Sequence, residues 1–426
     1  MSEGFLVIAG FFGLFVLGMP VAFAILVPAA IYIAVNGIPM AMVAQRVLYA
    51  LDSFPLVAVP VFIFVGNLMN AAGITERLFR FADVLVGRLW GGLGQVNVFA
   101  SLIFSGVSGA ALADVGGLGR VEIKAMSDRG FPLPFSASVT AASAIIGPIF
   151  PPSIPIIIYA SVTSVSAIQL LVAGIVPALL AVALLMATVA ILALVRDYPR
   201  AAHWPTPRTL WRAFWPAAPA LLAPVILIGG MLSGHFTPTE TSAVAVVYVL
   251  AIGAFFYRSM GWSFVVKAAV ETVRSTAAIL FIVAAAAMFG WILTVEGVPR
   301  DVAAGFAMIG SNPFVILLVV NIVFLIAGMF VDSTTATLLL VPIIAPPVVA
   351  AGIDPVHLGI VVIFNLMFGT VTPPFGLSLF LLSNMTGLSF SRLALAMVPF
   401  YPALLLALIL LTFVPELSLW IPSMLR

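Results

Sequence analysis

Residues 147–152 read GPIFPP and residues 369–374 read GTVTPP, so the pattern G-x-x-x-P-P occurs twice in the chain, 222 positions apart (147 to 369). Each copy lies inside a long apolar segment, the first at 133–163 and the second at 357–384. Proline has no backbone N–H and leaves the carbonyl one turn earlier without a donor, so a double proline after glycine interrupts a helix. Both segments are therefore predicted to be broken helices.

The same offset relates glycines that lie upstream of the two motifs. Gly106 matches Gly328, and Gly130 matches Gly352. Around the first pair the chain reads SGVSG in one half and GMFVDSTT in the other. Short runs of glycine and hydroxyl residues between apolar segments are typical of turns. We predict two repeats, each made of a helical hairpin and a broken helix.

The composition requires a lipid environment. Of the 426 residues, 63% are hydrophobic and 8% are charged, whereas a soluble domain carries about 25% charged residues. A membrane-spanning helix needs about 20 apolar residues, so the chain has room for about ten passes or more. The net charge of +2 gives no indication of nucleic-acid binding, and the absence of cysteine excludes disulfides and thiolate sites. We predict an all-α polytopic protein in a lipid bilayer, with no nucleic-acid partner.

Twelve apolar segments follow one another without a soluble domain between them. They lie at 5–35, 47–72, 93–118, 133–163, 167–195, 214–232, 240–257, 275–294, 312–330, 333–351, 357–384 and 393–423. The first is too long for the apolar part of a signal peptide and is predicted to be a retained membrane segment. We predict one membrane domain over 1–426, with repeat 1 at 93–163, scaffold and connecting helices at 164–311, repeat 2 at 312–384 and a C-terminal helix at 385–426.

Basic residues give these segments an orientation. Three flank segment 93–118 on each side: Arg77, Arg80 and Arg88 before it, and Arg120, Lys124 and Arg129 after it. The positive-inside rule places both loops in the cytoplasm, so this segment is predicted to be a re-entrant hairpin that enters and leaves on that side. Alternation then places the basic loop 196–212 in the cytoplasm and makes 312–351 a hairpin that enters from outside. The two repeats are therefore predicted to be inverted.

Hairpin tips and helix breaks at mid-membrane predict an internal polar site. Unpaired backbone groups cannot face lipid and must be buried in protein or line a cavity. Freed carbonyls and hydroxyls provide hard oxygen ligands suited to Na⁺, and the N-terminal ends of half-helices attract a carboxylate. Since few bases lie in the apolar segments, co-bound cations would offset the cost of bringing a carboxylate into the membrane.

For four ionisable residues the sequence predicts a role or a position. Asp332 at the second tip either senses a cation or caps the returning helix, and both readings stay open. Asp114, after the first tip, has the same two readings. Glu240 in the run TPTE is expected to cap a helix start, and His357 is expected at the outer membrane interface.

Several long stretches resemble one transporter family. They are GMPVAFAI (18–25), FSGVSGAALADVGGLG (104–119), AASAIIGPIFPPSIPIIIYA (141–160), FTPTETSAVAVVY (236–248), GMFVDSTTATLLLVPI (328–343) and GIDPVHLGIVVIFNLMFGTVTPPFGLSLF (352–380). Together they resemble the large permease subunit of tripartite ATP-independent periplasmic (TRAP) transporters, the DctM-like family. The resemblance implies an elevator-type importer of an organic acid, a carboxylate, in the bacterial inner membrane. It also implies sodium coupling, a small four-helix membrane subunit on a separate chain, and a periplasmic substrate-binding protein.

The resemblance also implies site residues. One sodium site would involve Ser105, Gly147, Phe150 and Pro152, and the other Gly328, Gly369, Thr372 and Phe375. The substrate would lie between the tips, near Ser108, Ser153, Thr334 and Thr335, beside Asp332.

Two other functions stay open at this point. A stand-alone sodium/divalent-anion symporter would share the architecture but need no binding protein. An intramembrane enzyme would need a catalytic set, for which only Asp114 and Asp332 are available, because the three histidines are far apart. We therefore predict that the chain is not an enzyme.

Overall fold

The computed structural model describes residues 3–71, 73–109, 111–201, 203–309 and 312–424. Every regular element in these ranges is a helix, so the prediction of an all-α protein is confirmed. Within the same ranges, seven helices are long and apolar enough to cross a membrane, or eight if a pair bent by 61° at Leu51–Phe54 counts as one span.

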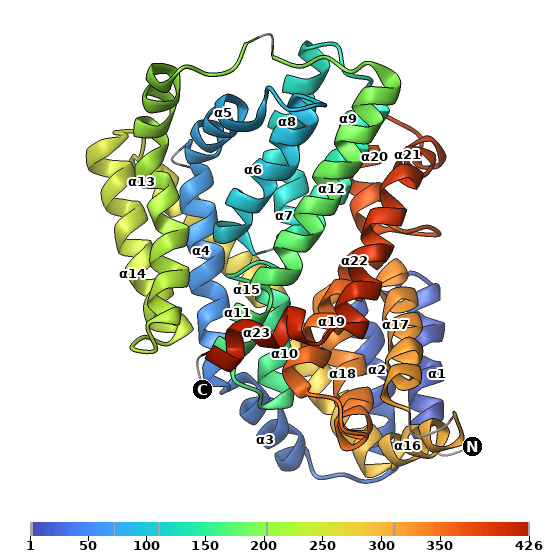
Figure 1. The fold of residues 1–426 in the computed structure, drawn as a ribbon. Helices are drawn as coiled ribbons and strands as arrows, with labels where there is room; N and C mark the ends of the chain where they lie inside the picture. The colour runs from blue at the N-terminus through green and yellow to red at the C-terminus, as the bar shows by residue number, and fades with distance from the viewer. Residues whose placement is uncertain (1–2, 72, 110, 202, 310–311, 425–426) are drawn as a thin grey trace.

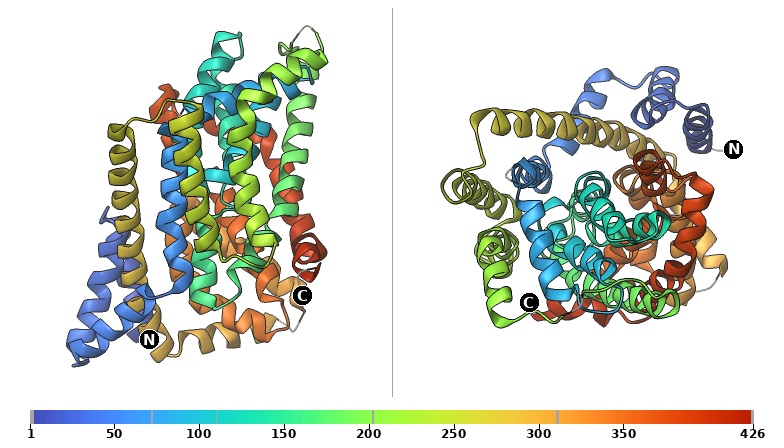
Figure 2. Two further views of the ribbon diagram at one scale, coloured as in Figure 1. Left: turned by 90° about the vertical axis from the view of Figure 1, so that its left-hand side faces the viewer. Right: turned by 90° about the horizontal axis from the view of Figure 1, so that it is seen from above.

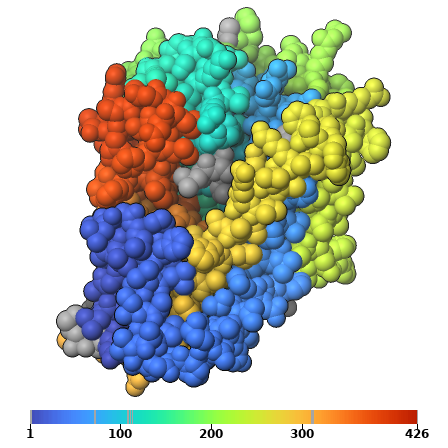
Figure 3. Space-filling model, turned by 180° about the vertical axis from the view of Figure 1, so that it is seen from behind, coloured from blue at the N-terminus to red at the C-terminus, as the bar shows by residue number. Residues whose placement is uncertain are grey.

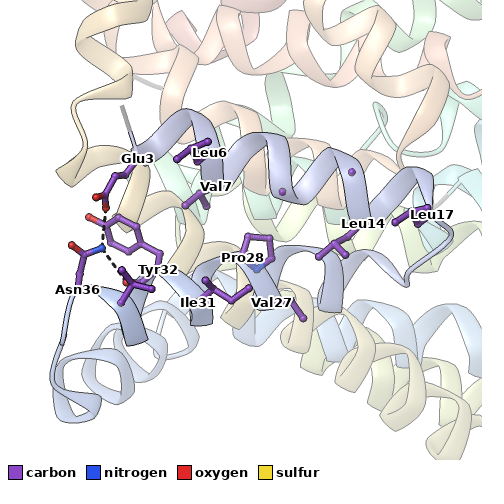
Figure 4. A pocket seen from close by; sticks show the side chains of 13 residues that line it. Glu3, Leu6, Val7, Leu14, Leu17, Val27, Pro28, Ile31, Tyr32 and Asn36 are labelled. Atoms are coloured by element: carbon purple, nitrogen blue, oxygen red, sulfur yellow. Dashed lines mark hydrogen bonds between the residues drawn. The ribbon is translucent and has the colours of Figure 1, made fainter. Parts of the chain in front are cut away.

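The N-terminal part consists of α1 (Glu3–Val16), α2 (Val21–Val35), α3 (Met40–Leu51), η1 (Phe54–Val57) and α4 (Ala58–Ala71). The prediction of one segment at 5–35 is wrong, because the chain turns between α1 and α2. Gly18 adopts a left-handed conformation (φ +86°) that few other residues tolerate, and Pro20 precedes the first turn of α2. The two helices enclose an apolar groove of about 580 Å³ (Figure 4).

Hydrogen bonds fasten this helix pair to the middle of the chain. Tyr32 donates to Glu296 Oε1 at 2.6 Å, and the Gly4 N–H donates to Glu296 Oε2 at 3.3 Å. Glu296 is the residue after α15 (Trp262–Val295), a helix of 34 residues that runs obliquely across one face of the molecule (Figure 3). Seen from above, α15 lies along one side of a central cluster of helices (Figure 2).

Before the C-terminal part, the other helices outside the two predicted repeats are α5 (Ile74–Val86), α11 (Ala167–Ala173), α12 (Ile175–Arg196), α13 (Pro207–Leu232), α14 (Pro238–Ala251), η3 (Ile252–Phe256) and α16 (Val298–Ile309). The expected cap at Glu240 is confirmed. The Thr237 hydroxyl accepts from the Glu240 N–H, and the Glu240 carboxylate accepts from the Thr237 N–H at 2.8 Å, which makes a capping box at the start of α14.

The first predicted hairpin and broken helix comprise α6 (Leu93–Ser108), α7 (Ala111–Gly116), α8 (Leu118–Asp128), α9 (Leu133–Ser143), η2 (Ala144–Ile146) and α10 (Ile154–Thr163). Helix α6 ends at Gly109, which has φ +61°, and the chain folds back there. No helix covers residues 147–153, so the structure has the predicted break at the first G-x-x-x-P-P motif.

The second predicted hairpin and broken helix comprise α17 (Pro313–Phe330), α18 (Ser333–Ala350), α19 (Pro355–Gly369) and α20 (Leu377–Thr386). The break at the second motif falls between α19 and α20. Helices α6 to α8 lie in the upper half of the molecule, and α17 and α18 lie in the lower half (Figure 1).

Two expectations for the C-terminal part are wrong. The predicted single helix at 385–426 is divided into α21 (Phe390–Met397), η4 (Val398–Phe400), α22 (Tyr401–Phe413) and α23 (Glu416–Met424), since Pro399 and Pro415 interrupt the pattern. His357 is not interfacial: it is 2% exposed, and its Nδ1 lies 2.8 Å from Ser418 Oγ on α23.

Helices α17 and α19 cross with their backbones in contact. A Cβ on Gly369 would lie 2.6 Å from Gly328 Cα and 2.7 Å from Leu325 O, and a Cβ on Gly328 would lie 2.9 Å from Leu366 Cα. Small residues at a crossing allow this approach in membrane proteins. Gly328 and Gly369 are thus where the second hairpin and its broken helix meet.

We expect Gly369→Ala to destabilise the protein, because the added methyl has no space between two backbones and overpacking costs about 1–3 kcal/mol. Thermal unfolding of the purified protein, followed by size-exclusion chromatography after heating, measures the effect. Gly13→Ala in α1 is the control, because a Cβ there meets nothing within 4 Å. Equal melting temperatures for both variants would contradict the tight crossing.

Candidate functional site

A cavity of about 120 Å³ lies where both hairpin tips and both helix breaks meet. Its polar lining is Asp332, Ser333, Thr334 and Thr370, and no lysine or arginine is among the described residues around it. Residues of α7, α10, α18, α19, α20 and the long helix α15 complete the walls. The cavity therefore joins the two halves of the chain to α15.

Besides the short helix α7, which begins with the lining residue Ala111, three longer helices begin at this cavity. Ile154 opens α10, Ser333 opens α18 and Leu377 opens α20, and all three residues line the cavity. The first turn of a helix carries a partial positive charge that favours an anion, although the N–H groups of Ile154, Thr334 and Thr335 already donate to Gly109 O and Asp332 Oδ1. Among the described lining residues no side chain is basic, so the positive charge at these helix ends comes from the backbone and is partly offset by Asp332.

Asp332 has a defined structural role at the second tip. Its Oδ1 accepts from the N–H groups of Thr334 at 3.0 Å and Thr335 at 3.1 Å, and its Oδ2 accepts from the Thr335 hydroxyl. This is an N-cap of α18, so the capping reading of Asp332 is seen directly. The carboxylate also lines the cavity, where its charge opposes the positive helix ends.

In the first half of the chain, the hairpin packs tightly against the broken helix. The Ile154 N–H donates to Gly109 O at 3.3 Å, and a Cβ on Gly109 would clash with Pro152 O. A Cβ on Gly147 would clash with the carboxylate of Asp114, which is 3% exposed. The structure thus brings the tip, Asp114 and the predicted residues Gly147 and Pro152 together.

The other predicted residues of this half also lie here. The Phe150 ring lies 3.7 Å from where a Cβ on Gly106 would be, next to Ser105 in the hairpin. Ser105 is fully buried, and its hydroxyl donates to Ser101 O at 2.5 Å, which leaves the oxygen lone pairs available.

A buried polar network, which the sequence reasoning missed, extends from Ser105 into the bundle. Asn97 Nδ2 donates to Thr140 Oγ1 at 2.7 Å, and the Ser143 hydroxyl donates to Asn97 Oδ1 at 2.8 Å. The Ser101 hydroxyl donates in turn to Ser143 Oγ at 3.0 Å. The sequence contains a pattern that indicates this network, because Asn97, Ser101 and Ser105 are spaced i, i+4 and i+8 and so lie on one face of α6.

The second half has a comparable arrangement. The Gly376 N–H donates to Met329 O at 3.0 Å, which ties the end of the break to the hairpin. The carbonyl oxygens of Thr370 and Thr372 converge on Gly376, at 3.2 and 3.1 Å from where its Cβ would be. The predicted residues Gly328, Gly369 and Thr372 are thus close to one another. Phe375 is 49% exposed, and its ring lies beside that of Phe330 with centroids 5.3 Å apart and planes tilted by 49°.

A second buried network, also missed from the sequence, links this hairpin to its broken helix. Asn365 Nδ2 donates to Asn321 Oδ1 at 2.7 Å, and Asn321 Nδ2 donates to Thr412 Oγ1 at 2.9 Å. Both asparagines are buried. These bonds join α17, α19 and α22.

The structure separates the predicted substrate residues into groups. Asp332 and Thr334 line the cavity. Ser153 and Thr335 are fully buried behind it, and the Ser153 hydroxyl bonds to Pro148 O and accepts from the Ile156 N–H as the N-cap of α10. The side chain of Ser108 lies outside those that the structure describes.

Several lining residues were not predicted. Pro148 and Thr370 lie inside the two G-x-x-x-P-P motifs, so the motifs themselves pointed to them. Ile279 comes from α15, and no pattern in the sequence indicates which face of that helix meets the cavity.

Comparison with known proteins identifies what this chain resembles. The family model described as "Tripartite ATP-independent periplasmic transporter, DctM component" matches residues 8–417. The sialic acid TRAP transporter large permease protein SiaM of Vibrio cholerae is 42% identical over 98% of each chain. The C4-dicarboxylate TRAP transporter large permease protein DctM of Pseudomonas aeruginosa is 38% identical over 87% of each chain.

Solved structures of other transporters share the fold. The crystal structure of the Alcanivorax borkumensis YdaH transporter has a TM-score of 0.63 at 17% identity, and the alignment covers 90% of this chain and 89% of that one. This likeness supports the helical architecture alone.

We expect Asp332→Ala to lower stability by about 0.5–2 kcal/mol, the cost of losing an N-cap, and Asp332→Asn to lower it much less, because the amide oxygen can still accept from Thr334. Thermal unfolding of the two variants beside the unchanged protein is the measurement. If Asn is as damaging as Ala, the carboxylate does more for the fold than cap α18.

Proposed function

The chain belongs to the DctM family of TRAP transporters as a large permease subunit, and we propose that it imports an organic acid and couples this import to the entry of sodium. It is a multi-pass protein of the bacterial inner membrane. Since the relatives are transporter permeases, the alternative of an intramembrane enzyme falls away. The observation that carries the proposal is the cavity at which both hairpins, both breaks and three helix N-termini meet.

We propose that the two halves are an inverted repeat. Three pairs of cavity-lining residues are 222 positions apart: Ala111 and Ser333, Pro148 and Thr370, and Pro155 and Leu377. Ile154 and Gly376, whose N–H groups bond to the two hairpins, are related by the same offset. The opposite placement of the hairpins in Figure 1 favours entry from opposite sides of the membrane.

The proposed sodium sites lie where each hairpin contacts its own break. In the first, Ser105 offers a buried hydroxyl oxygen beside Gly147, Phe150 and Pro152. In the second, Thr372 lies beside the Gly328–Gly369 crossing, and its hydroxyl donates to Phe368 O at 2.8 Å, which leaves lone pairs for a cation. Asp332 and Asp114 would contribute negative charge nearby.

The proposed substrate is a carboxylate bound at the cavity. Helix ends and the hydroxyl residues Ser333, Thr334 and Thr370 would meet its charge, with sodium ions supplying the rest. Relatives are named for sialic acid and for C4-dicarboxylates, and both names denote acids. A small membrane subunit and a periplasmic binding protein are the proposed partners.

We propose that transport occurs by an elevator mechanism, in which both hairpins and both broken helices move as one rigid body. The Asn97–Ser143 and Asn321–Asn365 hydrogen bonds favour this, because each fastens a hairpin to its broken helix. Ile279 of α15 would belong to the stationary wall, beside which the cavity moves.

Sodium coupling is tested in proteoliposomes that hold this chain with the small subunit and the binding protein. We expect uptake of labelled sialic acid or of a C4-dicarboxylate to require an inward sodium gradient and to stop when potassium replaces sodium on both sides. Equal uptake without sodium would overturn the coupling. Uptake of free substrate by the isolated chain would instead favour the stand-alone symporter.

The second sodium site is tested by a matched pair of substitutions. Thr372→Val should raise the sodium concentration for half-maximal uptake about tenfold, since a bond to a charged group contributes about 1.5–3 kcal/mol. Thr386→Val is the control, because the Thr386 hydroxyl bonds to Leu382 O at 2.7 Å with the same i to i−4 geometry on α20. Equal sodium dependence in the two variants would remove Thr372 from the site.

A further inference from the structure

A basic cavity of about 430 Å³ lies near the C-terminal end of α5. Part of its lining comes from the loop between α12 and α13, and Figure 1 shows this loop crossing the end of the bundle. The charged and polar residues around it are Asp83, Arg88, Arg129, His203, Thr206 and Thr209. A smaller cavity of about 130 Å³ shares Arg129 and Ala201 with it and adds Arg200. Neither cavity includes a residue of the transport site.

The charges at this cavity do not balance among themselves. Arg129 and Asp83 form a two-pronged ion pair, with distances of 3.1 Å to Oδ1 and 2.7 Å to Oδ2. The guanidinium of Arg88 lies 5.8 Å from the ring of Trp204, and among the described residues its buried Nε has no hydrogen-bond partner. With His203 counted as neutral, the lining carries one net positive charge and a donor that lacks an acceptor.

Helix α13 adds to the positive character. Its N-cap Thr206 accepts from the Thr209 N–H at 3.2 Å, and the two hydroxyls lie 2.8 Å apart at the cavity. The start of this helix of 26 residues contributes partial positive charge, as helix N-termini do. A single negative charge with several acceptor oxygens would satisfy all of these groups.

The surroundings are those of a membrane interface. Trp204, Trp211 and Trp215 are 64%, 63% and 59% exposed, and the last two stack with centroids 5.8 Å apart. Exposed tryptophans mark the level of lipid headgroups, and the basic loop 196–212 marks the cytoplasmic side. Basic pockets on that side attract anionic headgroups.

We propose that this cavity binds the phosphodiester of an anionic phospholipid from the cytoplasmic leaflet. The phosphate carries one negative charge, which matches the net charge of the lining. Its oxygens accept from Arg88 Nε and from the one hydroxyl of the Thr206–Thr209 pair that does not donate to the other. The acyl chains lie against Trp211 and Trp215. The proposal does not depend on the transported substrate or on sodium coupling.

The test is a titration of the purified chain in neutral detergent with phosphatidylglycerol, phosphatidylcholine or inorganic phosphate, read by thermal unfolding and by native mass spectrometry of bound lipid. We expect phosphatidylglycerol to bind and stabilise, phosphatidylcholine to do so several-fold less, and inorganic phosphate not to compete. Arg88→Gln should weaken phosphatidylglycerol binding about fivefold. Arg212→Gln removes a charge from α13 outside the cavity and should leave binding within about twofold.

A second variant separates binding from folding. Asp83→Asn removes the carboxylate that holds Arg129, so the freed guanidinium should tighten phosphatidylglycerol binding, a gain that misfolding cannot produce. Equal binding of phosphatidylglycerol and phosphatidylcholine would overturn the proposal. Competition by inorganic phosphate, or equal losses from Arg88→Gln and Arg212→Gln, would overturn it as well.

Discussion

Lipid offers no hydrogen bonds, so every backbone group freed by a helix break in this chain must be satisfied inside the protein. The two breaks at 147–153 and 370–376 therefore cannot stand alone. Each is covered by a hairpin, and at the end of each break an N–H donates to a hairpin carbonyl, from Ile154 to Gly109 and from Gly376 to Met329. Glycine is needed where backbone meets backbone, as at Gly328 and Gly369, because a side chain would hold the two segments apart.

The parts of this arrangement that could be predicted are those with a local cause. A double proline ends a helix wherever it occurs, so both breaks were found from the motif alone. The turn at Gly18 and Pro20 that divides segment 5–35 was missed because the residues on both sides of it are apolar. The prediction gave more weight to this continuous hydrophobicity than to the two residues that determine the backbone conformation of the turn. The burial of His357 was missed because it depends on α23, which is far away in sequence. Contact between distant helices leaves no mark in a single sequence unless a polar stripe, such as Asn97 to Ser105, shows which face is inside.

The buried amide and hydroxyl networks have a mechanical consequence. In the membrane an unpaired asparagine is costly, and Asn97 and Asn321 are each held by a partner on their own broken helix. Separating a hairpin from its broken helix would expose these groups to lipid, whereas moving the pair as one body keeps them satisfied. Ser143 and Asn365, the partners in the two halves, are related by the offset of the G-x-x-x-P-P motifs. The same bonds that stabilise the fold thus favour rigid-body movement of the hairpins with their breaks.

The central cavity and the cavity at the end of α5 differ in the charged residues around them. Among the described residues that line the central cavity there is a carboxylate, Asp332, but no lysine or arginine, while basic residues gather around the cavity at the end of α5. A permanent cation at the centre would hold an organic acid whether or not sodium was present, and release would then be independent of the gradient. A site built from helix ends has too little charge to neutralise an acid alone, because each end contributes about half a unit and Asp332 offsets part of it. On the proposed function, affinity for the acid therefore rises when sodium binds and falls when sodium leaves, which is the condition for the gradient to drive uptake.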